Sequence, residues 1–367
     1  MPKRRSQTNP KRVVYLWGAG ATQAEVSYLG ARRINLLMRD SDELGEGVAT
    51  RILGRLPARW RKAFGADPGT DIEKLVSLLA ASNVDTYHEL AETIRKLYFE
   101  DIRRSLITAG VLMNPQLAIG LLTMHRDRQF KEQETLTGII TTNHDGLLQL
   151  AAQRVDTEVN IGIPFRSSNI TQCETFTTVP LLHLHGSFTW TFGLPIEVSS
   201  LTKTSVYSAN TVWIPPTILK EAKNYPFNKL AGLAYELLSR QCDVLRVVGS
   251  ALTQNDWNIL SLIFNAQRQT ELRKGAPFRI ELIMSHDHGV TIKRECSYLK
   301  NLTPIGFLTD GDFAVYKERV DSHTAEMKNP LFYWMKEKIG FHRNRGDLAE
   351  PLASAIAPIA GELKGAA

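Results

Sequence analysis

The run Val13-Val-Tyr-Leu-Trp-Gly-Ala-Gly20 decides the fold that this sequence predicts. Its apolar residues indicate a buried strand, and the glycines end that strand at a tight turn. A helical pattern from Ala21 to Met38 begins directly after the turn. A strand, a glycine turn and a helix in this order are typical of the first unit of a doubly wound α/β sheet.

Four further segments complete the pattern. Short apolar runs at 138–142, 181–185, 244–248 and 278–284 predict strands, and helical patterns separate them. Strands that alternate with helices predict a Rossmann-like, doubly wound parallel sheet.

Helical patterning dominates the chain between the first two strands. The segment 41–130 predicts a large helical insertion, and within it residues 72, 75, 76 and 79 are apolar at amphipathic spacing. Glu73 falls between these positions, so we expect a solvated or ion-paired surface residue. We therefore predict a basic flexible tail at 1–12, a catalytic α/β domain at 13–290 and a helical C-terminal extension at 291–367, with an amphipathic helix around 330–341.

The net charge of +6 comes mostly from the tail. The five basic residues in 1–12 leave 39 basic against 38 acidic residues when they are set aside. Such a tail is either a solvated terminus or a contact for nucleic acid or an acidic partner.

Cysteine usage and hydropathy favour a cytoplasmic protein. Cys173, Cys242 and Cys296 are far apart, which argues against a structural zinc site and a disulfide scaffold. No apolar run approaches the roughly 18 residues of a membrane span, and no secretory signal is evident. We expect no metal and no membrane contact.

The glycine turn has two interpretations. Gly18 and Gly20 can let backbone N–H groups approach a phosphate at the helix N-terminus, or can simply form a tight turn. Gln23 stands where the dinucleotide fingerprint has its third glycine, which disfavours a standard NAD(P) dehydrogenase.

Polar residues follow the second strand. Asn143 can donate to and accept from a ribose hydroxyl or a water. Asp145 can stabilise a developing cation or can cap the next helix.

A histidine pair ends the next strand. His183 and His185 share one face of a strand, but no third metal ligand is evident nearby. At a strand end before Gly186, His185 is a candidate general base, because imidazole suits proton transfer near neutral pH.

The fourth strand ends in a similar way. Gly249 and Ser250 can bind a ribose or phosphate, and Asp256 can serve the site or cap a helix from Trp257. The carboxyl ends of parallel strands meet at one crevice. The sequence therefore predicts a nucleotide site that contains a titratable side chain.

Taken in order, these segments resemble the SIR2 (sirtuin-like) family. Gly18-Ala-Gly-Ala-Thr22 is similar to the family's GAG-x-S phosphate loop, and Thr142-Asn-His-Asp145 resembles its T-Q-N-x-D segment. His185-Gly186 resembles the catalytic H-G pair, and Gly249-Ser250 with Asp256 resembles the late G-[TY]-S-L…D segment. The stretches 210–216 and 71–75 are similar to segments of the bacterial SIR2-like branch.

Two differences from the sirtuin deacylases indicate which branch of the family the chain resembles more. The chain cannot supply their four-cysteine zinc module, and it has a long helical insertion. Both features resemble the SIR2 NADases of bacterial anti-phage defence, which deplete NAD+. The resemblance implies a homo-oligomer or a partner-controlled effector, with a HerA-type ATPase or another defence sensor as the partner.

The resemblance implies hydrolysis of the nicotinamide–ribose bond of NAD+ to nicotinamide and ADP-ribose. Catalytic roles fall to His185, Asn143 and Asp145. The nucleotide contacts are expected from these residues: Gly18, Ala19, Gly20, Thr22, Gly186, Gly249, Ser250 and Asp256. The alternatives are an NAD-dependent protein deacylase or ADP-ribosyltransferase, a non-catalytic NAD or ADP-ribose sensor, and a nucleic-acid-binding protein led by its basic tail.

Overall fold

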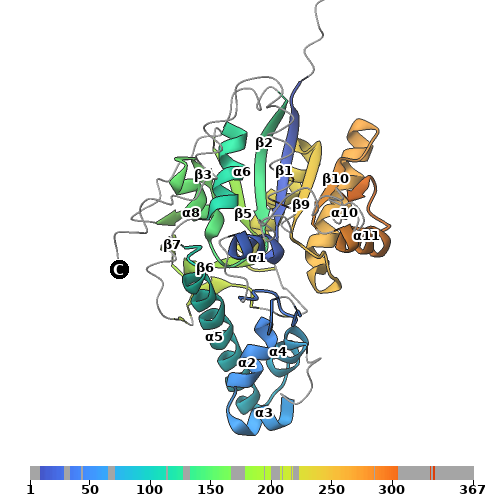
Figure 1. Cartoon of the computed structure of the whole chain (residues 1–367). Helices are drawn as coiled ribbons and strands as arrows, with labels where there is room; N and C mark the ends of the chain where they lie inside the picture. Colours follow the sequence, from blue (N-terminus) through green and yellow to red (C-terminus); the bar gives the residue numbers. More distant parts are fainter. Residues whose placement is uncertain are drawn as a thin grey trace, which may run out of the picture.

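A parallel sheet of seven strands lies at the centre of the protein (Figure 1). The structure is a computed structural model that describes residues 9–28, 34–42, 44–64, 71–112, 115–126, 133–166, 178–193, 195–199, 207–208, 210–215, 217, 223–284, 286–304, 331 and 334. The strand order is β11-β10-β9-β1-β2-β5-β3. The strands are β1 (Lys11–Trp17), β2 (Glu134–Thr141), β3 (Val159–Asn160), β5 (Val179–His183), β9 (Val244–Val248), β10 (Arg279–Ile283) and β11 (Leu302–Pro304).

Helices connect these strands and cover both faces of the sheet. They are α1 (Ala19–Tyr28), α2 (Val48–Arg55), α3 (Ala58–Phe64), α4 (Ile72–Ala80), α5 (Asp85–Thr108), α6 (Gln116–Arg126), α8 (Leu147–Arg154), α9 (Phe227–Gln241), α10 (Trp257–Lys274) and α11 (His286–Glu295). A 3-10 turn, η1 (Gln254–Asp256), leads into α10. The parallel sheet and these helices confirm the predicted doubly wound α/β fold.

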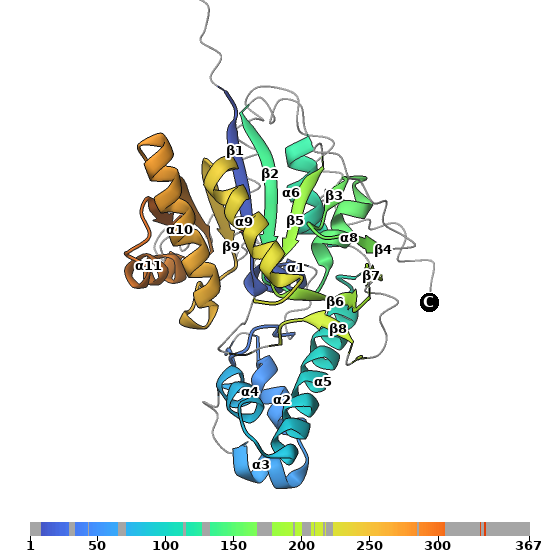
Figure 2. The same cartoon turned by 180° about the vertical axis from the view of Figure 1, so that it is seen from behind.

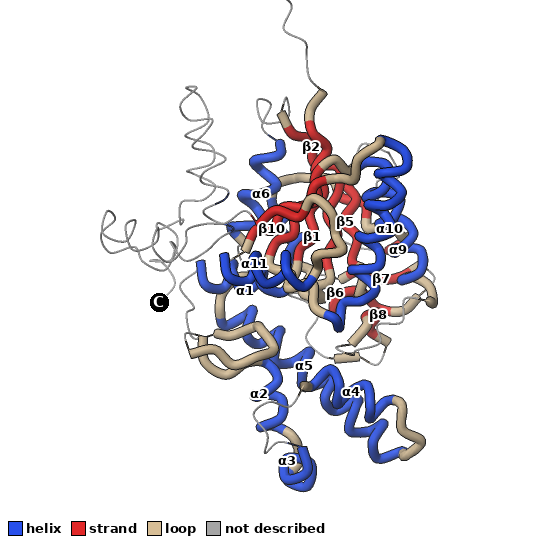
Figure 3. The backbone as a smooth tube through the Cα atoms, turned by 90° about the vertical axis from the view of Figure 1, so that its right-hand side faces the viewer, coloured by secondary structure: helices blue, strands red, loops and turns tan. Residues whose placement is uncertain are grey.

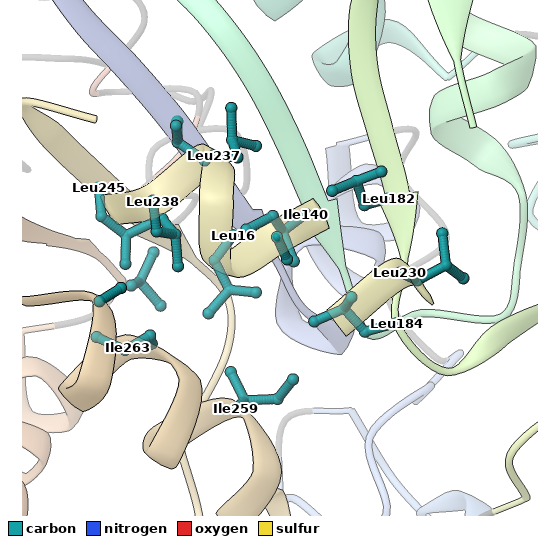
Figure 4. Packing of buried hydrophobic residues seen from close by; sticks show 14 of the residues in the cluster. Leu16, Ile140, Leu182, Leu184, Leu230, Leu237, Leu238, Leu245, Ile259 and Ile263 are labelled. Carbon is teal, nitrogen blue, oxygen red and sulfur yellow. The ribbon is translucent and has the colours of Figure 1, made fainter. Parts of the chain in front are cut away.

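The alternating direction of the side chains of β1 explains the two hydrophobic layers. Val14 and Leu16 pack with α9 and α10 on one face, whereas Val13, Tyr15 and Trp17 pack with α1, α6 and α8 on the other. Figure 3 shows α9 and α10 on one side of the sheet and α1 and α6 on the other. Successive side chains of a strand point to opposite faces, so one apolar run supplies two cores. Figure 4 shows the first core, where leucines and isoleucines of the sheet meet those of α9 and α10.

The chain reverses direction across the sheet at β1. After β1 it forms β2, β3 and β5 on one side, and then returns to β9, β10 and β11 on the other. The carboxyl ends of β1 and β9 therefore flank a topological switch point, where open α/β sheets bind their ligands. In register, Trp17 pairs with both Thr141 and Val248, so β1, β2 and β9 end at the same level.

Helices α2 to α5 form a second body beyond the carboxyl edge of the sheet (Figures 1 and 2). They share a hydrophobic core of their own, which includes Ile52, Val76 and Ile94. Phe188 and Trp213 join this core from a smaller sheet. The helical body is thereby fixed against the edge where the predicted site residues lie.

The smaller sheet has the order β4-β7-β6-β8. Its strands are β4 (Phe165–Arg166), β6 (Gly186–Thr191), β7 (Ile196–Val198) and β8 (Thr211–Trp213). Because only two residues, Leu184 and His185, lie between the end of β5 and the start of β6, the chain turns from one sheet into the other at His185.

Four buried polar side chains, Arg246, Glu134, Glu281 and Tyr15, form what we call the Arg246 network. The fully buried guanidinium of Arg246 donates to both carboxylate oxygens of Glu134 at 2.6 and 2.7 Å. It also donates to Glu281 at 2.8 Å and to the Tyr15 hydroxyl at 3.1 Å. The ring of Trp334 covers it, with its centroid 4.8 Å from the guanidinium carbon. The network ties β1, β2, β9 and β10 together.

Several elements differ from those that the sequence predicted; for example, β2 begins at Glu134 rather than at residue 138. The strand β1 begins at Lys11, so Lys11 and Arg12 are part of the sheet, and Arg12 pairs with Asp243 at 2.9 Å. The described part of helix α1 spans Ala19–Tyr28, and residues 34–38, which were predicted to belong to it, are not helical. The short edge strand β11 was not predicted, because its sequence lacks an apolar run. Residues 1–8 and most of the predicted helix at 330–341 lie outside the described residues, although Leu331 and Trp334 are buried.

A membrane span is not found among the helices that the structure describes, since none is both long and apolar enough.

Candidate functional site

The predicted site residues follow the carboxyl ends of β1, β2, β5 and β9 in the structure. We use the name edge cluster for the buried polar side chains of Thr22, Asn143, Asp145 and His185 at this edge. The first three are joined by hydrogen bonds, although 123 residues separate Thr22 from Asp145.

The three glycines of the site pack against each other. The amide of Gly18 donates to the carbonyl of Val248 at 2.9 Å, and the amide of Gly20 donates to the carbonyl of Gly249 at 2.7 Å. A Cβ on Gly249 would lie 2.1 Å from the nitrogen of Ala21, and the φ of Gly249 is +60°. Glycine is required here because the turn after β1 and the turn after β9 touch through their backbones. These contacts agree with the tight-turn interpretation.

Asn143 links the turn after β1 to the turn after β2. Its side-chain nitrogen donates to the carbonyl of Gly18 at 3.0 Å and to the hydroxyl of Thr22 at 2.9 Å. Its own amide donates to the hydroxyl of Thr141 at 3.0 Å. Both hydrogens of the side-chain amide are therefore engaged, and the orientation of Asn143 is fixed.

Asp145 accepts hydrogen bonds from two directions. One carboxylate oxygen accepts from the hydroxyl of Thr22 at 2.6 Å, and the other accepts from the amide of Leu147 at the start of α8 at 3.0 Å. The helix-start contact and the site contact that the sequence left open as alternatives are thus both present. Burial raises the pKa of Asp145 above its ordinary value, and these hydrogen bonds oppose that effect.

A second buried acid lies in α1 behind this cluster. Glu25 is fully buried, and its carboxylate accepts from the amides of Leu117 and Ala118 at the N-terminus of α6 at 3.0 and 2.5 Å. Burial raises the pKa of Glu25 to about 8, and the charge of Asp145 adds to this effect.

His185 lies at the corner between the two sheets and is buried. Its carbonyl accepts from the amide of Ile214 at 2.8 Å, which holds the corner against the end of β8. Its ring lies 6.2 Å from the ring of His144, and its Nε2 atom lies 3.4 Å from the side-chain nitrogen of Asn258 in α10. Gly186 has a φ of +72°, and a Cβ there would lie 2.2 Å from the carbonyl oxygen of Val212. The glycine after the histidine is needed for this sharp turn.

His183 has different surroundings from His185. Its Nδ1 atom lies 3.3 Å from the carbonyl oxygen of Asn143, and its ring packs by Trp190. Burial lowers the pKa of His183 to about 4, so the ring is neutral at physiological pH. Within the described ranges, no three His, Cys, Asp or Glu side chains are grouped as metal ligands would be.

The turn after β9 brings Gly249 and Ser250 to the same edge. Ser250 is buried, and its hydroxyl accepts from the amide of Leu252 at 3.4 Å. Asp256 stands at the N-cap position of α10, but its side chain makes no capping hydrogen bond. The helix-cap interpretation of Asp256 is therefore not what the structure has.

Two residues of this edge were not assigned to the site from the sequence. Asn258 touches His185, and Glu73 of α4 is half-buried and accepts from the side chain of Asn255 rather than being a surface acid. The buried Tyr98 lies near the same acids: burial, together with the charges of Glu73 and Asp145, raises the pKa of its hydroxyl far above the ordinary range. A helical pattern shows which side of α4 is apolar, but it does not show that a distant loop covers the polar side.

Comparison with known proteins adds no further assignment, because no family model and no curated protein matches the sequence.

Proposed function

We propose that this protein hydrolyses NAD+ at the nicotinamide–ribose bond and releases nicotinamide and ADP-ribose. The observation that carries the proposal is the edge cluster next to the topological switch point, where a hydrogen-bonded Thr22–Asn143–Asp145 group and a buried histidine follow the carboxyl ends of neighbouring strands. Nucleotides bind at such switch points, and a histidine there can move a proton.

The reaction requires only a few protein groups: one that stabilises positive charge and one that accepts a proton. Nicotinamide leaves as a neutral molecule, so the transition state resembles the oxocarbenium ion of glycoside cleavage. The carboxylate of Asp145 stabilises this cation or binds the carboxamide. His185 accepts a proton from a ribose hydroxyl or from the attacking water.

The hydrogen bonds of Asn143 limit what it can offer to the ligand. Both of its amide hydrogens donate within the protein. The carbonyl oxygen of the side chain is then the atom that serves NAD+, as an acceptor from the nicotinamide ribose or from water.

The rest of the nucleotide lies along the turns after β1 and β9 in this proposal. Because the amides of Gly18 and Gly20 already donate to the turn after β9, the pyrophosphate meets the N-terminus of α1 near Ala19 and Thr22. Gly249, Ser250 and Asp256 line the adenosine side.

The biological role that we propose is that of an NAD-depleting effector in anti-phage defence. It rests on the resemblance to the SIR2 NADases, which also underlies the proposed homo-oligomer and the HerA-type ATPase or other sensor as a partner. In such a protein the isolated chain can be held inactive until its partner or trigger is present.

The test is NAD+ consumption and nicotinamide release, measured by chromatography, for the wild type, His185→Ala and Asn143→Ala. Turnover by the wild type and a loss of about 10²–10⁴-fold in both variants is the expected result. His88→Ala is the matched control, because His88 is exposed on α5. Turnover that persisted in both site variants would overturn the site and its mechanism.

Other outcomes identify the alternative functions. Consumption of NAD+ only with an acylated or acceptor protein indicates a deacylase or an ADP-ribosyltransferase. Binding of ADP-ribose without turnover, with the partner present, indicates a sensor. Salt-sensitive DNA binding that is lost on deletion of residues 1–8 indicates nucleic-acid binding through the tail.

A further inference from the structure

The side-chain amide of Asn258 has one engaged group and one unengaged group. Asn258 is the second residue of α10, and its Nδ2 atom lies 3.4 Å from Nε2 of His185. Its Oδ1 atom is buried and has no hydrogen-bond partner among the described residues. A buried acceptor without a hydrogen-bond partner is unfavourable for folding, so its position next to a proposed base needs a physical explanation.

The contact is suited to one form of the histidine. An amide nitrogen can only donate, so it forms a hydrogen bond with Nε2 when the His185 ring is neutral and carries its proton on Nδ1. A half-turn of the amide about its last side-chain bond exchanges the two groups. The turned amide presents Oδ1 to Nε2, which is the partner that a protonated imidazole needs.

We propose that Asn258 is a positioning residue for His185, donating to the neutral ring and, after a half-turn, accepting from the protonated ring. The inference rests on the proposed function. In the proton-transfer step the O–H bond of a ribose hydroxyl or water breaks, and an N–H bond forms at Nε2. The long contact of 3.4 Å is weak enough to yield to the substrate hydroxyl.

The surroundings of Asn258 hold its backbone in place. Ile259 and Leu260, which follow it in α10, are buried, and Glu73 of α4 fixes the preceding turn through Asn255. On its outer side Asn258 lines a groove of about 540 Å³ between α9 and α10, which it shares with Leu184. The backbone is anchored while open space lies next to the side chain.

The first experiment follows the His185 ring directly and does not depend on turnover. The histidine rings of the full chain are titrated by NMR, and the signals of His185 and of the neighbouring His144 are assigned with His185→Gln and His144→Gln. We expect Asn258→Ala to move the His185 midpoint to lower pH by about half a unit, because the charged ring loses its acceptor. Asn258→Asp should move it to higher pH by one unit or more, since a carboxylate favours the charged ring.

The second experiment measures NAD+ hydrolysis by the same variants. We expect Asn258→Ala to lower kcat about tenfold and to change KM by less than about twofold, and Asn258→Asp to shift the acid limb of the pH–rate profile upward. Asn265→Ala is the matched control, because this exposed asparagine of α10 bonds to Ser261 within its own helix.

The two readouts separate the inference from the proposed function. If Asn258→Ala leaves the His185 midpoint unchanged, the positioning role is wrong whether or not NAD+ is hydrolysed. A moved midpoint with an unchanged kcat overturns the role in catalysis. If no variant and no wild type hydrolyses NAD+, the proposed function fails, and the titration still decides whether Asn258 controls the ring.

Discussion

The Arg246 network and the edge of the sheet around the edge cluster are both buried and polar, but they differ in how completely their side chains are paired. Every guanidinium nitrogen of Arg246 has a partner within the sheet, and Trp334 covers the group. Next to the edge cluster, by contrast, Asn258 contacts His185 at 3.4 Å, and its side-chain oxygen is buried without a partner among the described residues.

Position along the strands explains this difference. Arg246 and Glu281 lie within β9 and β10, where neighbouring strands surround them, whereas the edge cluster follows the strand ends. Complete pairing stabilises one structure, and incomplete pairing leaves groups that can serve a ligand. The two regions should therefore respond to substitution in opposite ways.

The largest expected effect is that of Arg246→Leu on stability. Removing the guanidinium breaks the buried ion pair with Glu134 and leaves Glu281 with the half-exposed Arg279, and breaking a buried pair typically costs about 3–5 kcal/mol. Urea denaturation of the variant and the wild type measures this difference. A loss below about 1 kcal/mol would show that the Arg246 network contributes little to the free energy of unfolding, in spite of its burial and complete pairing.

Asp145→Asn should affect activity far more than stability. Burial raises the pKa of Asp145, so its charge is unfavourable for folding, and removing the charge offsets the loss of one of its two acceptor oxygens; stability should change by about 1 kcal/mol or less. NAD+ hydrolysis should fall about 10²-fold or more, since the charge that stabilises the cation is lost. Denaturation and kinetics on the same sample check both halves, and a variant that is destabilised but fully active would contradict the comparison.

Glu25→Gln tests the acid behind the edge cluster through the pH dependence of stability. The pKa of Glu25 is about 8 in the folded protein against 4.5 ordinarily, so the folded state holds a proton that the unfolded state releases. This stabilisation is complete below pH 4.5 and is lost as the pH rises through 8.

Stability should be measured between pH 6.5 and 8. Below pH 6.5 the burial of His183, whose pKa is lowered, makes stability rise with pH and so opposes the effect of Glu25. There the wild type should lose up to about 1.4 kcal/mol of stability per pH unit more than Glu25→Gln. Denaturation at several pH values gives both slopes, and equal slopes would mean that Glu25 is ionised in the folded state.

The smallest effect is expected for Arg12→Ala at the other end of β1. Arg12 pairs with Asp243, but both side chains are about one-third exposed, at 36% and 34%. Solvent screens such a pair, so the loss should be about 1 kcal/mol or less. A loss comparable to that of Arg246→Leu would remove burial as the explanation for the difference between the two arginines.

The sequence predicted the strand ends better than the contacts between side chains. Apolar runs that stop at Gly18, Asn143, His185 and Gly249 placed these residues at one edge, because a parallel sheet has only one carboxyl edge. Side-chain partners such as Asn258 and Glu73 were missed, since no local pattern indicates which distant loop a helix faces.

Arg246 illustrates the same limit within a strand. It stands in an otherwise apolar run of the sequence, and its partners Glu134 and Glu281 lie 112 and 35 residues away. A single polar residue in a strand shows that a partner exists but does not identify it. The helix α1 was predicted too long for a related reason, because the helical pattern includes Ile34 and Leu36, whose backbone atoms instead bond to the side chain of Gln23.

The central place of β1 in the sheet has a consequence for synthesis on the ribosome. This strand is made first, yet its neighbours β2 and β9 begin at residues 134 and 244. The emerging chain must keep an apolar strand unpaired on one side while more than two hundred residues are added. We expect the nascent protein to need protection by chaperones until β9 leaves the exit tunnel, and to fold late rather than segment by segment.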